Sequence, residues 1–339
     1  MTRQDKALRG GARLLAAASL ACLLASPAAI AEERVTAMHV FPTNLIYTKT
    51  FLAIVDDINE RGKGVVRIDV LGGPEAIGMF QQPAAARDGV VDMVHVPGSF
   101  YGANVPEIDA MVGATVTPME ARAKGGTRLM DQAHQQRFNV RFLGWIDGGV
   151  KFHIYMANQP KFGADGVLDL TGVKLRDNPI YTAFFKALKA TTASLPATEV
   201  YSALEKGVVD AAAWTQIGLM DLKWDKFLKW RVDPAFYTTD IGIIFNLDRW
   251  RELSPEAQRI IEETIIEWEE KSYNDRQADV ARELAELERR GMKVAAHSEE
   301  GARKYLALAD EAVWGRMKER LAAMGDTTSY DKLRAIYHP

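Results

Sequence analysis

A repeated four-residue segment constrains the fold of this chain more than any other feature. Gly-Val-Val-Asp occupies residues 89–92 and again residues 207–210. Each copy follows a short helix-like stretch and leads into small or apolar residues typical of a buried strand. We expect each glycine to take the left-handed position that ends a helix, and the two valines to enter a sheet. Two such copies in matching contexts indicate two similar α/β lobes.

Strand-like and helix-like segments alternate along the first half of the chain. Residues 34–40 and 65–71 are strand-like, and between them apolar residues recur at helical spacing from Tyr47 to Ile58. Thr117 begins a capping box that predicts the start of another helix. Alternation of this kind is typical of an α/β fold with largely parallel sheets. The length of 339 residues also fits about two domains.

The last third of the sequence predicts long helices. Ser254 and Pro255 form a strong helix start, and neither glycine nor proline follows until Gly291. A continuous helix over residues 255–290 would be about 54 Å long, which exceeds the width of one lobe. Heptads are not sustained, which argues against a coiled coil. We therefore expect a helix that lies across both lobes, followed by an amphipathic helix from Ser298.

The N-terminus has the features of an export signal. Four basic residues, Arg3, Lys6, Arg9 and Arg13, precede an apolar run at residues 14–25, which is short for a membrane span. Residues 29–31 form an A-x-A cleavage site, so a periplasmic mature chain is expected to begin at Glu32. Cleavage would remove four basic residues and one acidic residue, and would change the formal net charge from −3 to −6.

Several functional classes find no support in the sequence. Cys22, the only cysteine, lies in the predicted signal peptide, so the mature chain would hold no disulfide or thiolate metal site. The histidines lack metal-ligand spacing, and the sequence lacks the motifs of zinc proteases, serine hydrolases and nucleotide-binding enzymes. Without a basic tract, nucleic acid is not an expected partner. The sequence therefore favours a binding protein with no metal or cofactor over an enzyme.

Four segments resemble one known family. Residues 170–176 (Leu-Thr-Gly-Val-Lys-Leu-Arg) are similar to the "dLkGlKiR" segment of TRAP-type (tripartite ATP-independent periplasmic) solute-binding proteins. Residues 181–188 match the helix that follows in that family, and residues 199–210 resemble its "EvYtALqrGvvDg" motif. Residues 253–258 resemble "LspeeQ" at the head of its long helix. The similarity extends over nearly the whole mature chain.

The resemblance implies a two-lobe α/β fold, that of a type II-like periplasmic binding protein, with a long helix spanning both lobes. We expect a signal peptide at residues 1–31, lobe I at 32–151 plus about 238–280, and lobe II at 152–237 plus about 281–339. The resemblance also implies that the lobes close on one small organic acid. The partners would be the membrane permease subunits of a TRAP transporter, driven by an ion gradient.

Arg176 is the strongest candidate for ligand binding. It ends a short predicted strand, and open α/β sheets bind ligands beyond the carboxyl ends of their strands. A guanidinium offers two parallel donors that match a carboxylate, which lysine does not. In the resembled family the arginine of this motif binds the ligand carboxylate. The alternative is a surface arginine paired with Asp177.

The chain departs from the family pattern at two positions. Many members have a second arginine after a Gly-Gly turn, where this chain has Lys151. Many also have an asparagine shortly after the second motif, where this chain has Trp214. A tryptophan in the cleft would stack on a flat or apolar ligand, and the alternative is a core tryptophan. This departure favours an apolar or aromatic monocarboxylate as the ligand.

Four further aromatic residues are candidates for which ordinary packing is an equally good explanation: Phe80, Phe100, Tyr101 and Tyr237. Phe100 and Tyr101 follow the first repeat where Trp214 follows the second. Other functions also remain open at this point. They are a sensory binding protein that docks on a receptor, the binding protein of an ATP-driven system, and an exported hydrolase or lyase.

Overall fold

The computed structural model describes residues 32–339, so the predicted signal peptide and its cleavage site lie outside the described residues. The strands of the first sheet are β1 (Glu33–His39), β2 (Val66–Gly72), β3 (Met93–Pro97), β4 (Val140–Trp145) and β12 (Ile241–Asn246). Those of the second sheet are β5 (Lys151–Met156), β8 (Lys174–Asp177), β9 (Thr191–Ser194), β10 (Ala211–Thr215), β11 (Trp230–Thr238) and β13 (Lys293–Ala296). A separate pair consists of β6 (Lys161–Phe162) and β7 (Leu168–Asp169).

The helices divide between the lobes and the segments that join them. Lobe I carries α2 (Ile46–Arg61), α3 (Gln82–Arg87), α4 (Asp109–Val112), α5 (Pro118–Ala123), α6 (Gly126–Phe138) and α9 (Leu247–Glu252). Lobe II carries α7 (Thr182–Ala187) and α8 (Ala197–Glu205). The last helices are α10 (Pro255–Arg289), α11 (Glu299–Ala323) and α12 (Ser329–Tyr337). Among residues 32–339, none of these helices combines the length and apolar character of a membrane span.

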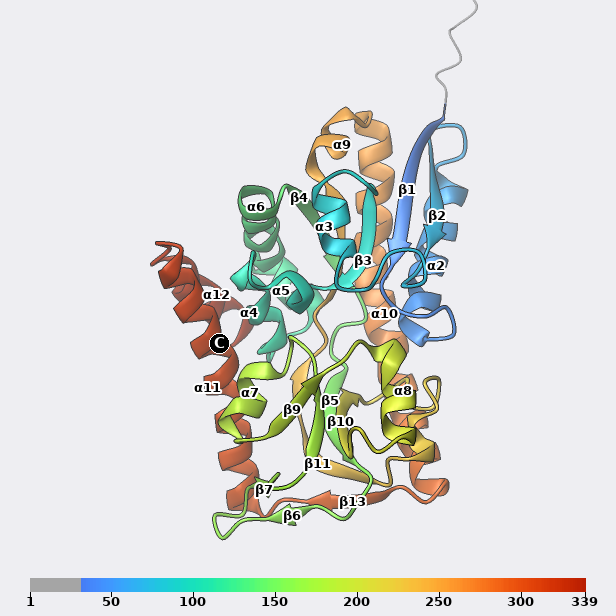
Figure 1. The fold of residues 1–339 in the computed structure, drawn as a ribbon. Helices are drawn as coiled ribbons and strands as arrows, with labels where there is room; N and C mark the ends of the chain where they lie inside the picture. The colour runs from blue at the N-terminus through green and yellow to red at the C-terminus, as the bar shows by residue number, and fades with distance from the viewer. Residues whose placement is uncertain (1–31) are drawn as a thin grey trace, which may run out of the picture.

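Each lobe is built on one sheet, and the two lobes stand one above the other in Figure 1. The strand order is β2-β1-β3-β12-β4 in lobe I and β13-β11-β5-β10-β8-β9 in lobe II. The chain passes to lobe II between β4 and β5 and returns between β11 and β12. The predicted two-lobe α/β fold is confirmed.

The sheets are mixed, although the sequence predicted largely parallel ones. In lobe I, β1 is parallel to β2 and β3, but β12 is antiparallel to β3 and β4. In lobe II, β5 is antiparallel to β10 and β11. The crossovers explain the difference. In lobe I, β4 runs towards the junction between the lobes and β12 runs away from it, so the two are antiparallel. In lobe II the same holds for β5, which enters the lobe, and β11, which leaves it.

The repeated Gly-Val-Val-Asp segments occupy corresponding places in the two lobes. Gly89 and Gly207 have φ values of 72° and 65°, as expected for glycines that end helices. Asp92 accepts a hydrogen bond from a backbone N–H of β1, and Asp210 accepts one from β8. Each aspartate therefore ties its strand to a neighbour. The prediction that the two valines enter a sheet was wrong, because β3 begins only at Met93 and β10 only at Ala211. The second valine of each pair is nevertheless buried.

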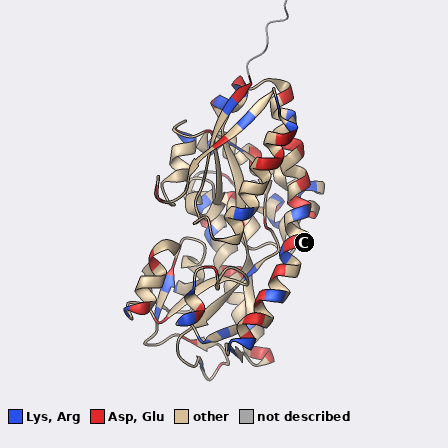
Figure 2. Cartoon of the chain, turned by 90° about the vertical axis from the view of Figure 1, so that its right-hand side faces the viewer, with Lys and Arg blue, Asp and Glu red and all other residues tan. Residues whose placement is uncertain are grey.

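Helix α10 passes behind both lobes as a single 35-residue helix (Figure 1). The side chain of Ser254 accepts a hydrogen bond from Ala257 N at 3.2 Å, which satisfies a free donor at the helix start. The N-terminal part packs against α2, β4 and α5 of lobe I. Figure 2 shows charged residues along the outer side of the long helices. The predicted helix across both lobes is confirmed.

The C-terminal helices connect the lobes a second time. Helix α11 contacts α7 and β11 of lobe II and α4 of lobe I, while α12 contacts α4 and α6 of lobe I. The sequence assigned residues from about 281 to 339 to lobe II, whereas the structure places α12 on lobe I. The 25-residue length of α11 explains this, because the helix carries the chain from one lobe back to the other.

Candidate ligand site between the lobes

A small apolar cavity lies between the lobes, with a volume of about 30 Å³. It is lined by Phe41, Tyr47, Pro97, Ser99, Phe100, Phe152, Asn178, Ile180, Tyr181, Trp214, Thr215, Thr239, Asp240 and Ile241. This volume is roughly the share of one molecule in liquid water. The lobes are thus in contact around the cavity, and the cavity is too small for an organic acid unless the lobes separate or the aromatic rings move. We call this arrangement the closed form.

Hydrogen bonds between the lobes hold this closed form beside the cavity. Tyr47 donates its hydroxyl hydrogen to Thr215 Oγ1 at 2.8 Å. Asn44 Nδ2 donates to the backbone oxygen of Asp221 at 2.7 Å, and Ile46 N donates to the Asp221 carboxylate at 3.1 Å. These bonds join the start of α2 to the segment after β10. They would break if the lobes moved apart.

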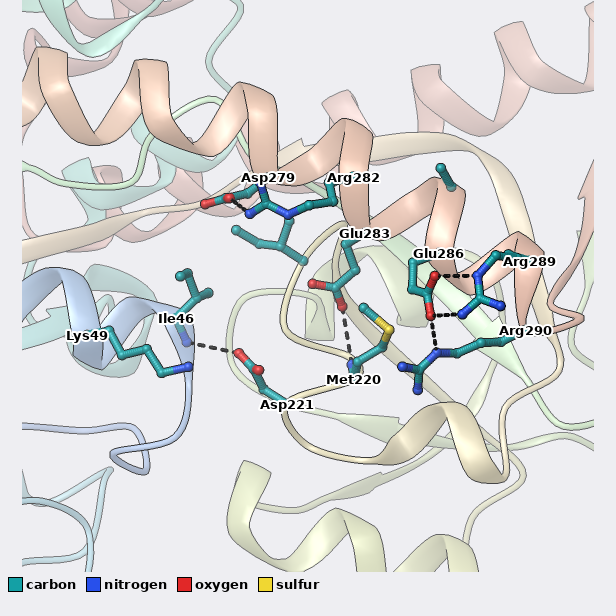
Figure 3. A pocket seen from close by; sticks show the side chains of 12 residues that line it. Ile46, Lys49, Met220, Asp221, Asp279, Arg282, Glu283, Glu286, Arg289 and Arg290 are labelled. Atoms are coloured by element: carbon teal, nitrogen blue, oxygen red, sulfur yellow. Dashed lines mark hydrogen bonds and ion pairs between the residues drawn. The ribbon is translucent and has the colours of Figure 1, made fainter.

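A second hollow, about 620 Å³ in volume, lies between α2, α10 and the segment after β10 (Figure 3). Glu286 pairs with Arg289 and Arg290, and Asp279 pairs with Arg282. Most charges in this hollow thus neutralise one another at the surface. We therefore place the candidate ligand site in the interlobe cavity instead.

Arg176 lies in β8 beside Trp214, which lines the interlobe cavity, but Arg176 is not itself a lining residue. Its Nε donates to Leu195 O at 2.9 Å, and its guanidinium lies 6.0 Å from the ring centre of Trp214 and 5.9 Å from that of Trp224. The side chain is 1% exposed, and Nη1 has no hydrogen-bond partner among the described residues. The alternative, a surface arginine paired with Asp177, does not occur in this structure.

The electrostatic environment of Arg176 is unfavourable to its charge. Burial lowers the pKa of the guanidinium, because desolvation disfavours the charged form. Within residues 32–339 the guanidinium forms no ion pair, and Asp177 accepts a hydrogen bond from Thr182 Oγ1 instead. An arginine remains protonated in proteins, so this site holds a buried positive charge without a direct ion pair. Asp177 and Tyr181 stabilise this charge in part, and burial outweighs them.

Trp214 and Phe100 line the cavity from opposite lobes. Trp214 belongs to β10 and packs edge-on against Phe41, with ring centres 6.1 Å apart, and against Trp224 at 4.9 Å. Its Nε1 is buried without a hydrogen-bond partner in the described part of the chain. Phe100 follows β3 and is supported edge-on by Phe80 at 4.7 Å. Phe80 itself does not line the cavity.

Three predicted candidates lie away from the interlobe cavity. Lys151 begins β5 with an exposed side chain, while the next residue, Phe152, lines the cavity. The alternation of side chains along a strand explains why Lys151 points elsewhere. The hydroxyl of Tyr101 lies 3.0 Å from Nε2 of a histidine in α6, inside lobe I. Tyr237 donates to a backbone oxygen of α11 at 3.0 Å.

The sequence reasoning missed Asp240 and Tyr181 as cavity residues. Asp240 lies in the crossover between β11 and β12, is 1% exposed, and accepts a hydrogen bond from Ser99 N at 2.6 Å. Burial raises the pKa of its carboxyl to about 6. Tyr181 donates to Ala213 O at 3.1 Å. The sequence held only indirect signals that these residues belong to the site. Asp240 lies close to the predicted lobe boundary, and Tyr181 begins one of the segments that resemble the family.

Two lobes that are joined by crossovers and closed over a cavity define a solute-binding protein of the periplasmic type, which closes around its ligand. No three His, Cys, Asp or Glu side chains in residues 32–339 are grouped so as to hold a metal ion. Residues 37–319 match bacterial extracellular solute-binding protein family 7 (DctP), and the chain belongs to this family. The resemblance to TRAP-type solute-binding proteins is confirmed, and the chain is a solute receptor and not an enzyme.

Two curated relatives share about a quarter of their aligned residues with this chain. A monocarboxylate 2-oxoacid-binding periplasmic protein of Nostoc sp. is 25% identical over 256 residues, which cover 72% of this chain and 68% of that protein. A solute-binding protein of Albidiferax ferrireducens is 24% identical over 181 residues. That alignment spans about half of each protein, 51% in both cases.

Solved structures of TRAP-type receptors share the fold. DctP7 of Bordetella pertussis, which binds pyroglutamic acid, has a TM-score of 0.77 and 17% identity, with coverage of 90% of this chain and 99% of DctP7. A TRAP transporter solute-binding protein from Bordetella bronchiseptica, with calcium and picolinate in its site, has a TM-score of 0.76 and 19% identity. That match covers 90% of this chain and 92% of the other. At these identities the likeness establishes the fold alone.

Proposed function

We propose that this protein captures a small organic acid between its lobes, outside the cytoplasmic membrane, and delivers it to the permease subunits of a TRAP transporter. The ligand carboxylate pairs with Arg176. The rest of the ligand, an apolar or aromatic body, packs against Trp214 and Phe100. The observation that carries this proposal is the buried Arg176 guanidinium, which has no direct ion pair and an unpartnered Nη1 within residues 32–339.

A buried charge without a partner is costly, with an effective penalty of several kcal/mol per ion. A ligand carboxylate would supply the missing counter-charge. It would also accept hydrogen bonds from Arg176 Nη1 and Trp214 Nε1, two buried donors that lack partners within residues 32–339. A hydrogen bond between a charged donor and a carboxylate is stronger than one between two neutral groups. The two free donors therefore support a carboxylate as the anchored group.

The lining of the cavity supports an apolar or aromatic ligand body. Six of its lining residues are aromatic: Phe41, Tyr47, Phe100, Phe152, Tyr181 and Trp214. Aromatic rings bind flat or apolar groups through large buried areas and edge-on contacts. The names of the similar proteins agree with an acidic ligand, since they include 2-oxoacids, pyroglutamic acid and picolinate.

Closure of the lobes is the proposed mechanism of capture. A ligand favours the closed form only by as much as it binds that form more tightly than the open one. Arg176 and Trp214 belong to lobe II and Phe100 to lobe I, so a ligand touches both sides only when the lobes are closed. The permease then distinguishes the loaded receptor by its closed surface.

A thermal-shift screen of the purified protein against small carboxylic acids tests the proposed function. A ligand at 100 times its dissociation constant stabilises a protein by roughly 2.7 kcal/mol, which produces a clear rise in Tm. We expect at least one aromatic or apolar monocarboxylate to raise the Tm. No shift with any carboxylate would contradict the proposal. Delivery is tested separately, by ligand uptake into vesicles that contain candidate TRAP permease subunits, with and without this protein.

A further inference from the structure

Two buried charged residues of opposite sign lie at or beside the interlobe cavity. Asp240 lines it, and Arg176 lies next to the lining residue Trp214 without lining the cavity itself. Arg176 belongs to a strand of lobe II, and Asp240 belongs to the crossover that returns the chain to lobe I. Each side chain is 1% exposed, and neither forms an ion pair within residues 32–339. Asp240 is also the only charged residue in the lining of this cavity, as far as the described residues define it.

The local hydrogen bonds hold Asp240 in place. Its Oδ2 accepts from Ser99 N at 2.6 Å, and its backbone oxygen accepts from Gly98 N at 2.9 Å. These bonds come from the segment that follows β3 in lobe I. The Ser99 hydroxyl and the backbone N–H of Asp240 also lie close enough to favour the charged carboxylate. The hydrogen bond from Ser99 N goes to Oδ2, so Oδ1 is the oxygen that a ligand donor would reach. A carboxylate is acceptor-only when ionised, so the matching ligand group is a donor.

We propose that Asp240 determines specificity by selecting acids that carry an N–H or O–H donor in addition to their carboxylate. The carboxylate pairs with Arg176, and the donor group gives its hydrogen bond to Asp240. The favoured class comprises 2-hydroxy acids and acids with an amide or ring N–H. This inference rests on the proposed function and adds the chemical class of the ligand.

Two kinds of acid are disfavoured by this arrangement. An acid without a donor leaves the buried Asp240 carboxylate unpaired, and sites built to hydrogen-bond a ligand reject analogues that lack the hydrogen. A dicarboxylate brings a second negative charge towards Asp240, and like charges in a buried site repel each other. Discrimination against the first kind should be roughly 10- to 100-fold in Kd, the range for a hydrogen bond to a charged group.

Pairs of acids that differ in one atom test the inference. Pyrrole-2-carboxylate and furan-2-carboxylate are flat monocarboxylates of similar size, but only the first has a ring N–H. Lactate and propionate form an aliphatic pair that differs by one hydroxyl. Calorimetric titration of the purified protein should show tighter binding of the donor-bearing member, by roughly tenfold or more, in at least one pair. Equal binding, or tighter binding of the member without a donor, in both pairs would overturn the inference.

Asp240→Asn connects the preference to this side chain. The carboxamide keeps an oxygen for Ser99 N and turns an NH₂ donor towards the cavity, so the preference for pyrrole-2-carboxylate should disappear or reverse. Asp177→Asn is the matched control, because Asp177 is buried near Arg176 but does not line the cavity. This control should keep the preference. A preference that persists in Asp240→Asn would overturn the role of Asp240.

The outcomes separate this inference from the proposed function. If the acids bind through Arg176 without any preference for a donor, the inference fails and the proposed function stands. If no acid binds at all, both fail. The comparison of acid pairs uses the unaltered protein, so it decides the question even if a variant does not fold.

Discussion

Tyr47 in α2 of lobe I donates a hydrogen bond to Thr215 at the end of β10 in lobe II, with 2.8 Å between the oxygens. Both residues line the interlobe cavity. Thr215 Oγ1 donates in turn to Ile217 O at 2.6 Å, so the contact is part of a short chain of hydrogen bonds. Closure of the lobes and the walls of the ligand site thus depend on the same pair of side chains.

Tyr47→Phe should weaken ligand binding without changing the cavity wall. The variant loses one hydrogen bond between the lobes, worth about 0.5–1.5 kcal/mol, so Kd should rise roughly 2- to 12-fold. Calorimetric titration measures the change. Tyr155→Phe is the control, because the Tyr155 hydroxyl also bonds to Thr215 but stays within lobe II. An unchanged Kd in Tyr47→Phe would show that this bond does not contribute to closure.

Arg316→Met should destabilise the whole protein. Arg316 in α11 forms a buried ion pair with Asp109 of lobe I and donates to Pro179 O of lobe II at 2.8 Å. Removal of one partner of a buried pair typically costs about 3–5 kcal/mol, because the other charge remains buried. Urea unfolding measures this loss. The control is Arg334→Met, which removes a more exposed ion pair and should cost about 1 kcal/mol or less.

The pH dependence of stability should contain a contribution from Asp147, which lies in the first crossover between the lobes. The residue is fully buried, and its Oδ1 accepts a hydrogen bond from Thr50 and lies 3.6 Å from Arg276 Nη1. Burial raises the pKa of its carboxyl from 3.8 to about 7. Between about pH 4 and 7 the folded chain keeps this proton while the unfolded chain loses it. The contribution of Asp147 to stability therefore falls as the pH rises through this window.

Asp147→Asn should remove this part of the pH dependence. Asparagine stays neutral and tolerates the positive φ of 52° at this position. The variant should gain stability over the parent at pH 8, by up to about 4 kcal/mol, and much less at pH 5. Urea unfolding at both pH values gives the comparison. An equal difference at pH 5 and pH 8 would contradict the titration of Asp147 in the folded state.

Ligand binding should quench tryptophan fluorescence mainly through Trp214. The chain has seven tryptophans, and Trp214 lines the interlobe cavity. Trp214→Phe should therefore lose most of the quench on addition of an aromatic acid. Trp268→Phe removes a tryptophan of α10 that bonds to Asp57 in lobe I, and this control should keep the quench. A full quench in Trp214→Phe would place the ligand away from this ring.

Local chemistry made much of the fold predictable. The capping box at Thr117 and Glu120 forms both of its hydrogen bonds, and the long helix begins at Pro255 as its start signal indicates. The two valines of each repeat were predicted to enter a sheet, but the strands begin only at Met93 and Ala211, and the first valine of each pair is exposed. Helix starts, which depend on residues close together in the sequence, were therefore predicted more reliably than the positions of strands, which depend on burial.

The candidate site was less predictable, because contacts between distant segments determine it. Whether Lys151 or Phe152 faces the cavity depends on the pairing register of β5 with its neighbouring strands. A shift of that register by one residue would move every side chain of β5 to the opposite face of the sheet. Asp240 belongs to no motif, and only the return of the chain between the lobes brings it to the cavity. Trp214 could be identified from the sequence, because it stands where many members of the resembled family have an asparagine after the second Gly-Val-Val-Asp segment.

The central claim is that Arg176 binds the carboxylate of the ligand, and calorimetric titration of Arg176→Met measures it most directly. The unpaired buried charge is removed, so the ligand-free variant should be at least as stable as the parent. Its affinity for the acid found by screening should fall by roughly 100-fold or more. Arg231→Met is the control, because Arg231 is buried but already paired with Asp233 and Glu288. Binding to Arg176→Met that matches the parent would contradict the claim.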